Sequence, residues 1–404
     1  MRALRFNAVT SPLLGALWMV VLSTTIAVIM SFATGAAFRP HLLFALFWGG
    51  IIGWTIGHRL GDFWGEVMGT IALAILIVMG FGPLSIGTET GWFPSAFAAI
   101  ALSTAFTYSV HVILDDLPHG ALNRHEFERA VIRFLTGFGY IFFSAIVLIP
   151  FYVMVMTSFK NQAELMQNPL DFSIDLSKGA ALFRSYDELF TQFNFGTYLF
   201  NSFFISVLTV IITLAFAIPG AYAVARLRFQ GRALFSRSIL LIYMVPMIVL
   251  ALPIYIAFST TGLRNTFSGI VMIYPVTTIP VALYMLQGYF RGLPAEVEEA
   301  GLMDGLSRLA VIWKITLPLS LPALASVSLY VFMIAWNEFL LAFMLLDDPS
   351  KFTLTRGIAS LNSSEIPRQH LMAGSVIATV PIMALFLGLE RFMTKGLTAG
   401  SVKG

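Results

Sequence analysis

RGLPAEVEEAGLMDGLSRLAVIWKITLP, residues Arg291 to Pro318, is a polar stretch between two long apolar runs. Pro294 suits the first turn of a helix, and the three glutamates that follow it lie near the positive helix end. Gly305 can adopt the positive φ that ends a helix. The apolar residues from Leu306 to Ile315 recur at helical spacing. We therefore predict two short amphipathic helices that meet at Gly305 and offer a docking surface outside the apolar runs.

The composition is that of a membrane protein. The chain is 58% hydrophobic and 11% charged, with a mean hydropathy of +0.84, whereas a soluble domain carries about 25% charged residues. It has no cysteine, which excludes disulfides, thiolate metal sites and cysteine nucleophiles. Arg2 and Arg5 precede an apolar run that is too long for a signal peptide, so we expect a retained span. These features predict an all-α polytopic membrane protein.

Ten apolar runs are candidate membrane spans. They are Leu13–Ala33, Leu42–Ile56, Val67–Phe81, Phe93–Leu114, Phe134–Met156, Leu199–Val224, Phe235–Phe258, Phe267–Phe290, Leu319–Leu345 and Leu371–Phe392. We expect residues 1–120 to form an extra membrane region of about four spans. Residues 121–133 would be a cytoplasmic linker, within a polar stretch that predicts a short surface helix. Residues 134–404 would form a six-span core with a cytoplasmic loop at 291–318 and a tail at 394–404.

The distribution of basic residues predicts the orientation. With the N-terminus in the cytoplasm, 16 of the 24 Lys and Arg fall on cytoplasmic segments. An even number of spans then also places the C-terminus in the cytoplasm. The outer side receives Thr157–Tyr198, which has no long apolar run, and the loop Asp347–His370. The Arg291–Pro318 loop falls on the cytoplasmic side.

Three motifs resemble one known family. Glu299-Ala300-Gly301, three residues, Gly305, nine residues and Ile315-x-Leu317-Pro318 resemble the EAA loop of bacterial ABC-importer permeases, with Gly301 where that family usually has Ala. Trp-Asn-Glu-Phe at Trp336–Phe339 and the ending GLTAGSVKG at Gly396–Gly404 are similar to sugar permeases of the maltose type, in particular their G-type subunit. The resemblance covers Phe134 to Gly404. It does not extend to the first 120 residues.

The resemblance implies a type I ABC importer fold with extra N-terminal spans. It implies that the chain is no enzyme but a permease subunit in the bacterial inner membrane, forming half of the path for a di- or oligosaccharide. The chain has no Gly-x-x-x-x-Gly-Lys-[Ser/Thr] loop, so a partner ATPase would bind ATP and Mg and no cofactor is expected in this chain. The other implied partners are a second permease and a periplasmic solute-binding protein, together with the sugar and membrane lipid. Nucleic acid is not among them.

The resemblance also implies roles for two groups of residues. Those expected to couple to the ATPase are Glu298, Glu299, Ala300, Gly301, Asp304, Gly305, Ile315, Leu317 and Pro318. In the tail, Gly396, Gly400, Lys403 and Gly404 would insert between two ATPase subunits.

A third group could line the sugar path. Glu338 is ionisable within an apolar span, which is costly unless it faces protein or water. It and Asn337 could either contact sugar or hold the structure. Aromatic and amide side chains that could contribute to the path are Trp336, Tyr243, Tyr274, Tyr284 and Gln287. Each of these could equally be a packing residue.

Other functions remain open at this stage. One alternative is an ABC permease for a polyol or a glycerol phosphodiester, and a less favoured one is an ion-driven secondary transporter. A membrane enzyme is disfavoured because no carboxylate pair is evident. His111, Asp115 and His119 have the spacing of metal ligands, but Pro118 interrupts the helix and we expect no metal site.

Overall fold

The computed structural model describes residues 5–58, 63–114, 117–169, 171–363 and 365–398. Two compact units make up the chain, Met1–Leu182 and Phe183–Gly404. Within the described residues both units are helical, apart from one pair of three-residue antiparallel strands in the first unit. The boundary between the units lies within the polar segment Thr157–Tyr198, which follows the fifth predicted span.

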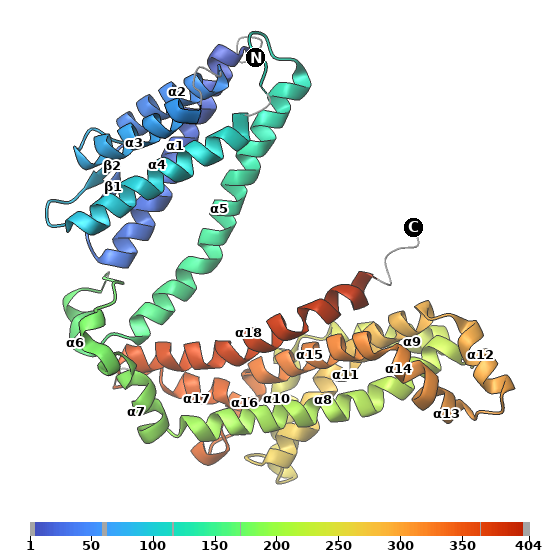
Figure 1. Cartoon of the computed structure of the whole chain (residues 1–404). Coiled ribbons are helices and arrows are strands. Elements are labelled where there is room, and N and C mark those ends of the chain that lie inside the picture. The colour runs from blue at the N-terminus through green and yellow to red at the C-terminus, as the bar shows by residue number, and fades with distance from the viewer. Residues whose placement is uncertain (1–4, 59–62, 115–116, 170, 364, 399–404) are drawn as a thin grey trace. The chain divides into compact units, whose positions relative to one another are not determined.

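In its described residues, the N-terminal unit has the helices α1 to α5, a pair of short strands and a polar segment that contains α6 (Figure 1). Its elements are α1 (Asn7–Thr34), β1 (Phe38–Pro40), α2 (Leu42–Gly57), α3 (Phe63–Val78), β2 (Leu84–Ile86), α4 (Trp92–Leu114), α5 (Arg124–Ser158), α6 (Gln162–Gln167) and the 3₁₀ segment Leu176–Phe183. Asn123 and Glu126 form a capping box that starts α5 at Arg124. The short helix predicted in the polar linker is therefore the first part of α5, because no turn separates the two.

Small residues let α1 and α2 approach closely. A Cβ added at Gly53 would lie 2.5 Å from the carbonyl oxygen of Ser11 and 2.9 Å from Cα of Gly15. One at Gly49 would lie 2.6 Å from the carbonyl oxygen of Gly15. Such backbone proximity is the usual way in which helices associate within a bilayer, where apolar burial gives no driving force.

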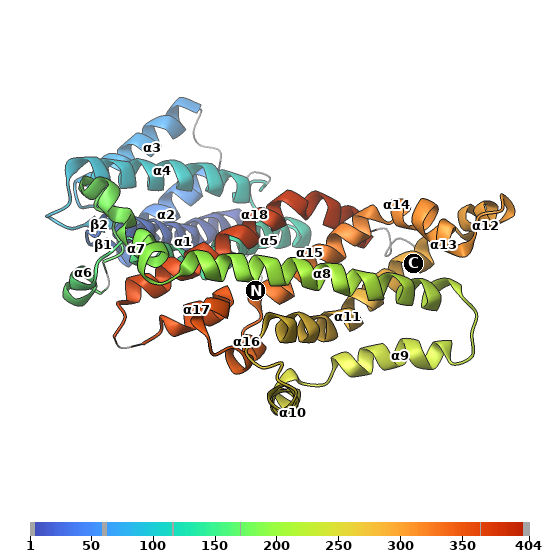
Figure 2. The same cartoon turned by 90° about the horizontal axis from the view of Figure 1, so that it is seen from below.

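The C-terminal unit has its own helices and two buried clusters. Its elements are α7 (Arg184–Gln192), α8 (Phe195–Arg226), α9 (Arg232–Tyr243), α10 (Met247–Thr260), α11 (Phe267–Gly292), α12 (Ala295–Met303), α13 (Arg308–Val311), a π-helical turn (Ile312–Thr316), α14 (Leu317–Leu319), α15 (Leu321–Asn337), α16 (Leu340–Leu345), a 3₁₀ turn (Pro349–Lys351), α17 (Leu354–Ser360) and α18 (Arg368–Thr398). Figures 1 and 2 place α12 and α13 at one end of α8 and α11, and α16 and α17 toward the other.

The number of full-length spans is smaller than predicted. In the part of the chain that the structure describes, six helices are long and apolar enough to cross a membrane, or up to seven if one bent pair counts as a span. Three of the ten predicted spans correspond to shorter apolar helices, at Leu42–Gly57, Gly65–Val78 and Met247–Thr260. Ten candidate spans are therefore more than the described long helices account for, because hydropathy alone does not indicate where a helix ends.

Two predicted spans are broken by identifiable residues. The run Phe235–Phe258 is divided into α9 and α10 just before Pro246, which is the N-cap of α10 and lacks the N–H that a continuous helix would need. The run Leu319–Leu345 is divided at Glu338, where ψ is 123°. A further bend of 81° separates Arg308–Leu319 from Leu321–Asn337.

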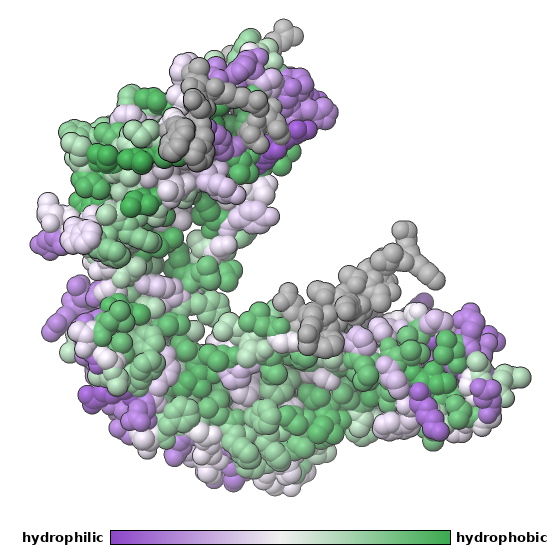
Figure 3. Space-filling model, viewed as in Figure 1, coloured by the Kyte–Doolittle hydropathy of each residue, from purple (hydrophilic) through white to green (hydrophobic). Residues whose placement is uncertain are grey.

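Surface hydropathy agrees with a membrane location. In Figure 3 the sides of the long helices are largely hydrophobic, and hydrophilic residues gather at the end of the C-terminal unit that carries α12 and α13. A soluble protein would instead hide most of this apolar surface, so the long helices are suited to lipid or to partner helices.

Candidate functional site

The polar loop folds as two short helical segments joined at Gly305. The α12 segment begins after Pro294, which is its N-cap and so lies one position before the predicted first turn. Gly305 has φ +84°, which confirms the predicted positive φ. The Ser307 side chain then accepts a hydrogen bond from the backbone N–H of Ala310 and starts α13. The loop is therefore a shaped element rather than an irregular connection.

Glu298 fixes this loop to the long helices. Its side chain is almost fully buried, and its Oε1 lies 3.3 Å from Nε of Arg226 at the end of α8. The same oxygen accepts a hydrogen bond from the Thr316 hydroxyl at 3.1 Å, and Oε2 accepts one from the Tyr222 hydroxyl at 3.3 Å. Arg226 also donates from Nη2 to the carbonyl of Leu293 at 2.7 Å. These contacts join both ends of the loop to the end of α8.

Gly301 is buried where the two arms of the loop meet. A Cβ at this position would lie 2.5 Å from Cδ1 of Ile315 and 3.4 Å from Cδ1 of Leu306. Glycine therefore lets the Ile315 side chain pack closely against α12.

Four exposed residues of the loop combine charge with apolar side chains. Glu299 is exposed, and so are Met303, Leu309 and Trp313, with 88%, 71% and 71% of their surfaces accessible. Large apolar side chains exposed together on a polar loop are typical of a binding surface. We call these four residues the loop face. Of the remaining motif residues, Ala300, Asp304 and Pro318 are exposed, and Ile315 and Leu317 are half-buried.

The break in the ninth predicted span is a second polar site. Glu338 accepts hydrogen bonds from the backbone N–H groups of Leu341 and Ala342, at 2.8 and 3.1 Å, and from the Tyr274 hydroxyl at 2.7 Å. Its carboxylate thus satisfies the free N–H groups at the start of α16. Neighbouring Asn337 is exposed and donates to the carbonyl of Met333 at 2.9 Å.

The comparisons with known proteins agree with one another. Residues 217–398 match the family model described as "Binding-protein-dependent transport system inner membrane component". The chain is 37% identical over 287 residues to the inner membrane ABC transporter permease protein YcjP of Escherichia coli, covering 70% of this chain and 100% of that one. It is 34% identical to the trehalose/maltose transport system permease protein MalG of Thermococcus litoralis, over 69% of this chain and 99% of that one.

The chain belongs to this permease family. It is accordingly a multi-pass inner-membrane component of a binding-protein-dependent transport system, and not an enzyme. Membership implies, in general, a second permease, an ATPase and a solute-binding protein as partners.

A solved structure supports the fold. One similar chain comes from the crystal structure of a bacterial ABC transporter involved in the import of the acidic polysaccharide alginate. The match covers 65% of this chain and 97% of that chain, with a TM-score of 0.56 and 24% sequence identity. This likeness identifies the fold as that of a type I importer. The whole of YcjP aligns with 70% of this chain, so YcjP has no segment that corresponds to the rest of it.

Three of the residues predicted to line the sugar path, Trp336, Tyr274 and Gln287, are buried within the permease. Trp336 donates from its indole N–H to the carbonyl of Ala378 at 3.1 Å, and Tyr274 is 1% exposed. Gln287 is 3% exposed and accepts from the Ser236 hydroxyl at 3.1 Å. Tyr284 is 48% exposed. The structure therefore leaves Asn337 and Tyr284 as the described path residues whose side chains are exposed.

Several predicted site residues lie partly or wholly outside the described residues. Tyr243 is the last residue of α9, but its side chain is not described. Gly396 lies within α18, so the predicted tail begins inside this helix. Gly400, Lys403 and Gly404 lie outside the described residues, as does Asp115 of the three residues with metal-ligand spacing. Of the other two, His111 lies 3.0 Å from Glu66.

Ion pairs order the two segments predicted to face outward. Arg184 and His370 both contact Glu188, at 2.8 and 2.7 Å, and together they lower the pKa of this carboxyl. In the N-terminal unit, burial would raise the pKa of Asp171. Hydrogen bonds from Lys160 and Ser173 outweigh that effect and lower the pKa to about 2. Both segments therefore present defined surfaces.

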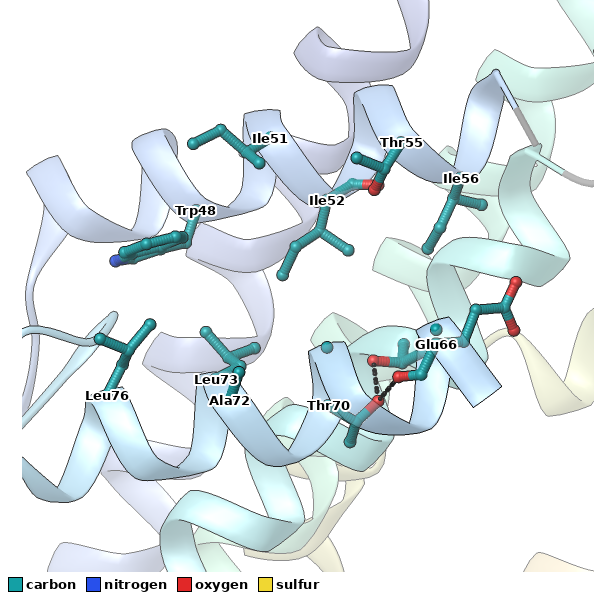
Figure 4. Close-up of a pocket in the computed structure, with 13 residues that line it drawn as sticks. Trp48, Ile51, Ile52, Thr55, Ile56, Glu66, Thr70, Ala72, Leu73 and Leu76 are labelled. Atoms are coloured by element: carbon teal, nitrogen blue, oxygen red, sulfur yellow. Dashed lines mark hydrogen bonds between the residues drawn. The ribbon is translucent and has the colours of Figure 1, made fainter. Parts of the chain in front are cut away.

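The N-terminal unit contains an apolar groove between α2 and α3 (Figure 4). It has a volume of 360 Å³, with Trp48, Ile52 and Leu73 among its lining residues and with the hydroxyl groups of Thr70 and Thr107 hydrogen-bonded at 2.9 Å. Its lining suits a lipid chain or a helix side chain equally, so the groove does not indicate a particular ligand.

Proposed function

We propose that this permease forms half of the translocation path of an ATP-driven importer for a carbohydrate. The proposal rests on the loop face: an exposed carboxylate and three exposed apolar side chains on an element that Glu298 and Arg226 join to a long helix. A partner that binds this face could transmit a movement to α8, because Glu298 contacts Arg226 and Tyr222 of that helix.

The partner of the loop face would be a cytoplasmic ATPase dimer that binds ATP and Mg. Glu299 would pair with a basic residue in a cleft of the ATPase, while Met303, Leu309 and Trp313 fill apolar depressions around it. The N-terminus and C-terminus would both lie in the cytoplasm, as the distribution of Lys and Arg favours. The tail after Thr394 would reach between the ATPase subunits.

A sugar is the substrate class that the relatives support. Three of them are named for transport of trehalose/maltose, arabinooligosaccharides and diacetylchitobiose. The path would run along exposed faces that carry Asn337 and Tyr284, opposite a second permease. The outward segments around Glu188 and Asp347–His370 would meet the solute-binding protein. Residues 1–120 would be an additional membrane region that precedes the core at 134–404 in the sequence.

Reconstituted import tests the proposal. The permease, its second permease and the ATPase would be placed in proteoliposomes, with a panel of labelled di- and oligosaccharides and the solute-binding protein outside. We expect import of one sugar that requires both internal ATP and the binding protein and that continues when ion gradients are collapsed. Import that needs an ion gradient and no ATP would contradict the proposal and favour the secondary transporter.

A further inference from the structure

A basic cavity lies at the same end of the C-terminal unit as the segment Ala295–Leu319, which we call the coupling loop. The cavity has a volume of 720 Å³ and is formed by the connection between α8 and α9, the first turns of α9 and the end of α11. Arg232, Arg237 and Arg291 line it, together with the apolar side chains of Phe229 and Leu234. The motifs and the relatives assign no role to these residues.

A hydrogen bond between two helices places the arginines together. Ser236 on α9 donates to Gln287 on α11 at 3.1 Å. Arg232 lies one turn before Ser236, and Arg291 lies one turn after Gln287, so each arginine shares a helix face with a bonded residue. Because α9 and α11 run in opposite directions, Arg232 and Arg291 lie on the same side of the hydrogen bond between Ser236 and Gln287. Arg232 is further fixed because its Nη2 donates to the carbonyl of Ala225 at 3.1 Å.

The cavity carries positive charge without a counter-charge of its own. No carboxylate is among its lining residues, and within the described part of the chain neither Arg237 nor Arg291 forms an ion pair. The N-terminus of α9, a helix of 12 residues, adds a partial positive charge at the same place. Like charges that line one cavity repel one another, so a bound anion would stabilise the arrangement.

The apolar residues in the same cavity identify the kind of anion. Leu234 is 72% exposed and Phe229 is 43% exposed, directly beside the arginines. A small soluble anion would use the guanidinium groups and leave these side chains in water. A phospholipid would use both, because its phosphate accepts paired hydrogen bonds from arginine while its acyl chains cover the apolar groups.

We propose that this cavity binds the headgroup phosphate of an anionic phospholipid of the cytoplasmic leaflet, through Arg232, Arg237 and Arg291. The leaflet follows from the proposed function, which puts the coupling loop in the cytoplasm. The bound lipid would brace the α8–α9 connection against α11, next to the link that enters the coupling loop.

Native mass spectrometry of the complete importer complex tests the proposal directly. Phosphatidylglycerol and phosphatidylcholine with the same acyl chains would be titrated, and the dissociation constant of the first bound lipid measured for each. We expect tighter binding of phosphatidylglycerol. Arg237→Gln and Arg291→Gln should each weaken it about fivefold, the effect of one basic side chain at a membrane surface, and should leave phosphatidylcholine unaffected.

Arg228→Gln is the matched control. Arg228 is an exposed arginine on the same connection but does not line the cavity, so this variant should bind phosphatidylglycerol as the parent does. Equal loss in Arg228→Gln would show a diffuse charge effect and overturn the site, as would equal affinity for the two lipids. Displacement of phosphatidylglycerol by inorganic phosphate would assign the cavity to a soluble anion instead.

A remaining alternative is that the ATPase covers the cavity. If phosphatidylglycerol binds more tightly than phosphatidylcholine only after the ATPase has been removed, the proposal is contradicted. The assay measures no transport, so failure of sugar import and failure of the lipid site are separate results.

Discussion

The coupling loop, Ala295–Leu319, and the broken span, Leu321–Leu345, each contain a hydrogen-bonded carboxylate next to an exposed polar residue. In the loop Glu298 is buried and Glu299 is exposed. In the span Glu338 is largely enclosed by its partners and Asn337 is exposed. The carboxylates differ in what they neutralise: Glu298 faces a guanidinium, whereas Glu338 faces a helix N-terminus and a hydroxyl.

This difference determines what a substitution leaves behind. Without Glu298, the largely enclosed guanidinium of Arg226 keeps its hydrogen bond to the carbonyl of Leu293 but loses its neutralising carboxylate. Without Glu338, the groups left unpaired are neutral donors. An uncompensated buried charge is costlier than an unsatisfied neutral group, so the two sites should respond unequally to the same change.

The largest effect on stability is expected for Glu298→Ala. Loss of one partner of a buried ion pair costs about 3–5 kcal/mol. The purified permease complex should therefore unfold at a clearly lower temperature. The double variant Glu298→Met/Arg226→Met removes both charges and should recover most of the loss. Thermal unfolding in detergent measures this, and a double variant as unstable as Glu298→Ala would show that the ion pair is not what fixes the loop.

A smaller effect is expected for Glu338→Ala. Tyr274 and two backbone N–H groups lose their acceptor, which costs about 1–3 kcal/mol. Glu338→Gln keeps one acceptor oxygen and should retain both the folded complex and the KM for sugar. The yield of assembled complex and the import kinetics are the two measurements. An increase in KM for Glu338→Gln, at an unchanged yield, would instead place this side chain in the sugar path.

The smallest effect is expected for Gly301→Ala. The one close contact of the added Cβ, at 2.5 Å, would be with the flexible end of the Ile315 side chain. Alanine gains about 1 kcal/mol of helix propensity over glycine. These terms nearly cancel, so the unfolding temperature should change little. Gly301→Val cannot fit by a movement of Cδ1 alone and should be clearly destabilised. If both variants lose the same stability, the packing account of this glycine is wrong.

The sequence predicts the loop better than it predicts the spans. The motif spacing indicates two segments and a turn at Gly305, because glycine is the residue that adopts a positive φ most readily. Hydropathy indicates the long helices α1, α5 and α8. It cannot indicate the break at Glu338, because the fragments on both sides of the break are equally apolar.

The contacts within the site could not be predicted. Glu298 and Arg226 are far apart in the chain, and no local pattern pairs them. A weak signal exists, since Arg226 ends a span on the side that carries the loop. The choice between Glu298 and Glu299 as the exposed residue depends on how α12 packs against α8, which only the folded structure shows.

The central claim is that the loop face binds the ATPase, and Glu299→Lys tests it most directly. The side chain is exposed, so the variant should fold and insert normally. Charge reversal in the partner's cleft should prevent retention of the ATPase during purification and abolish sugar-stimulated ATP hydrolysis. The control is Glu365→Lys, an equal charge change at an exposed position on the predicted outer loop, which should retain the ATPase. The account predicts loss of the ATPase for Glu299→Lys alone, and normal retention with normal stimulated hydrolysis would contradict it.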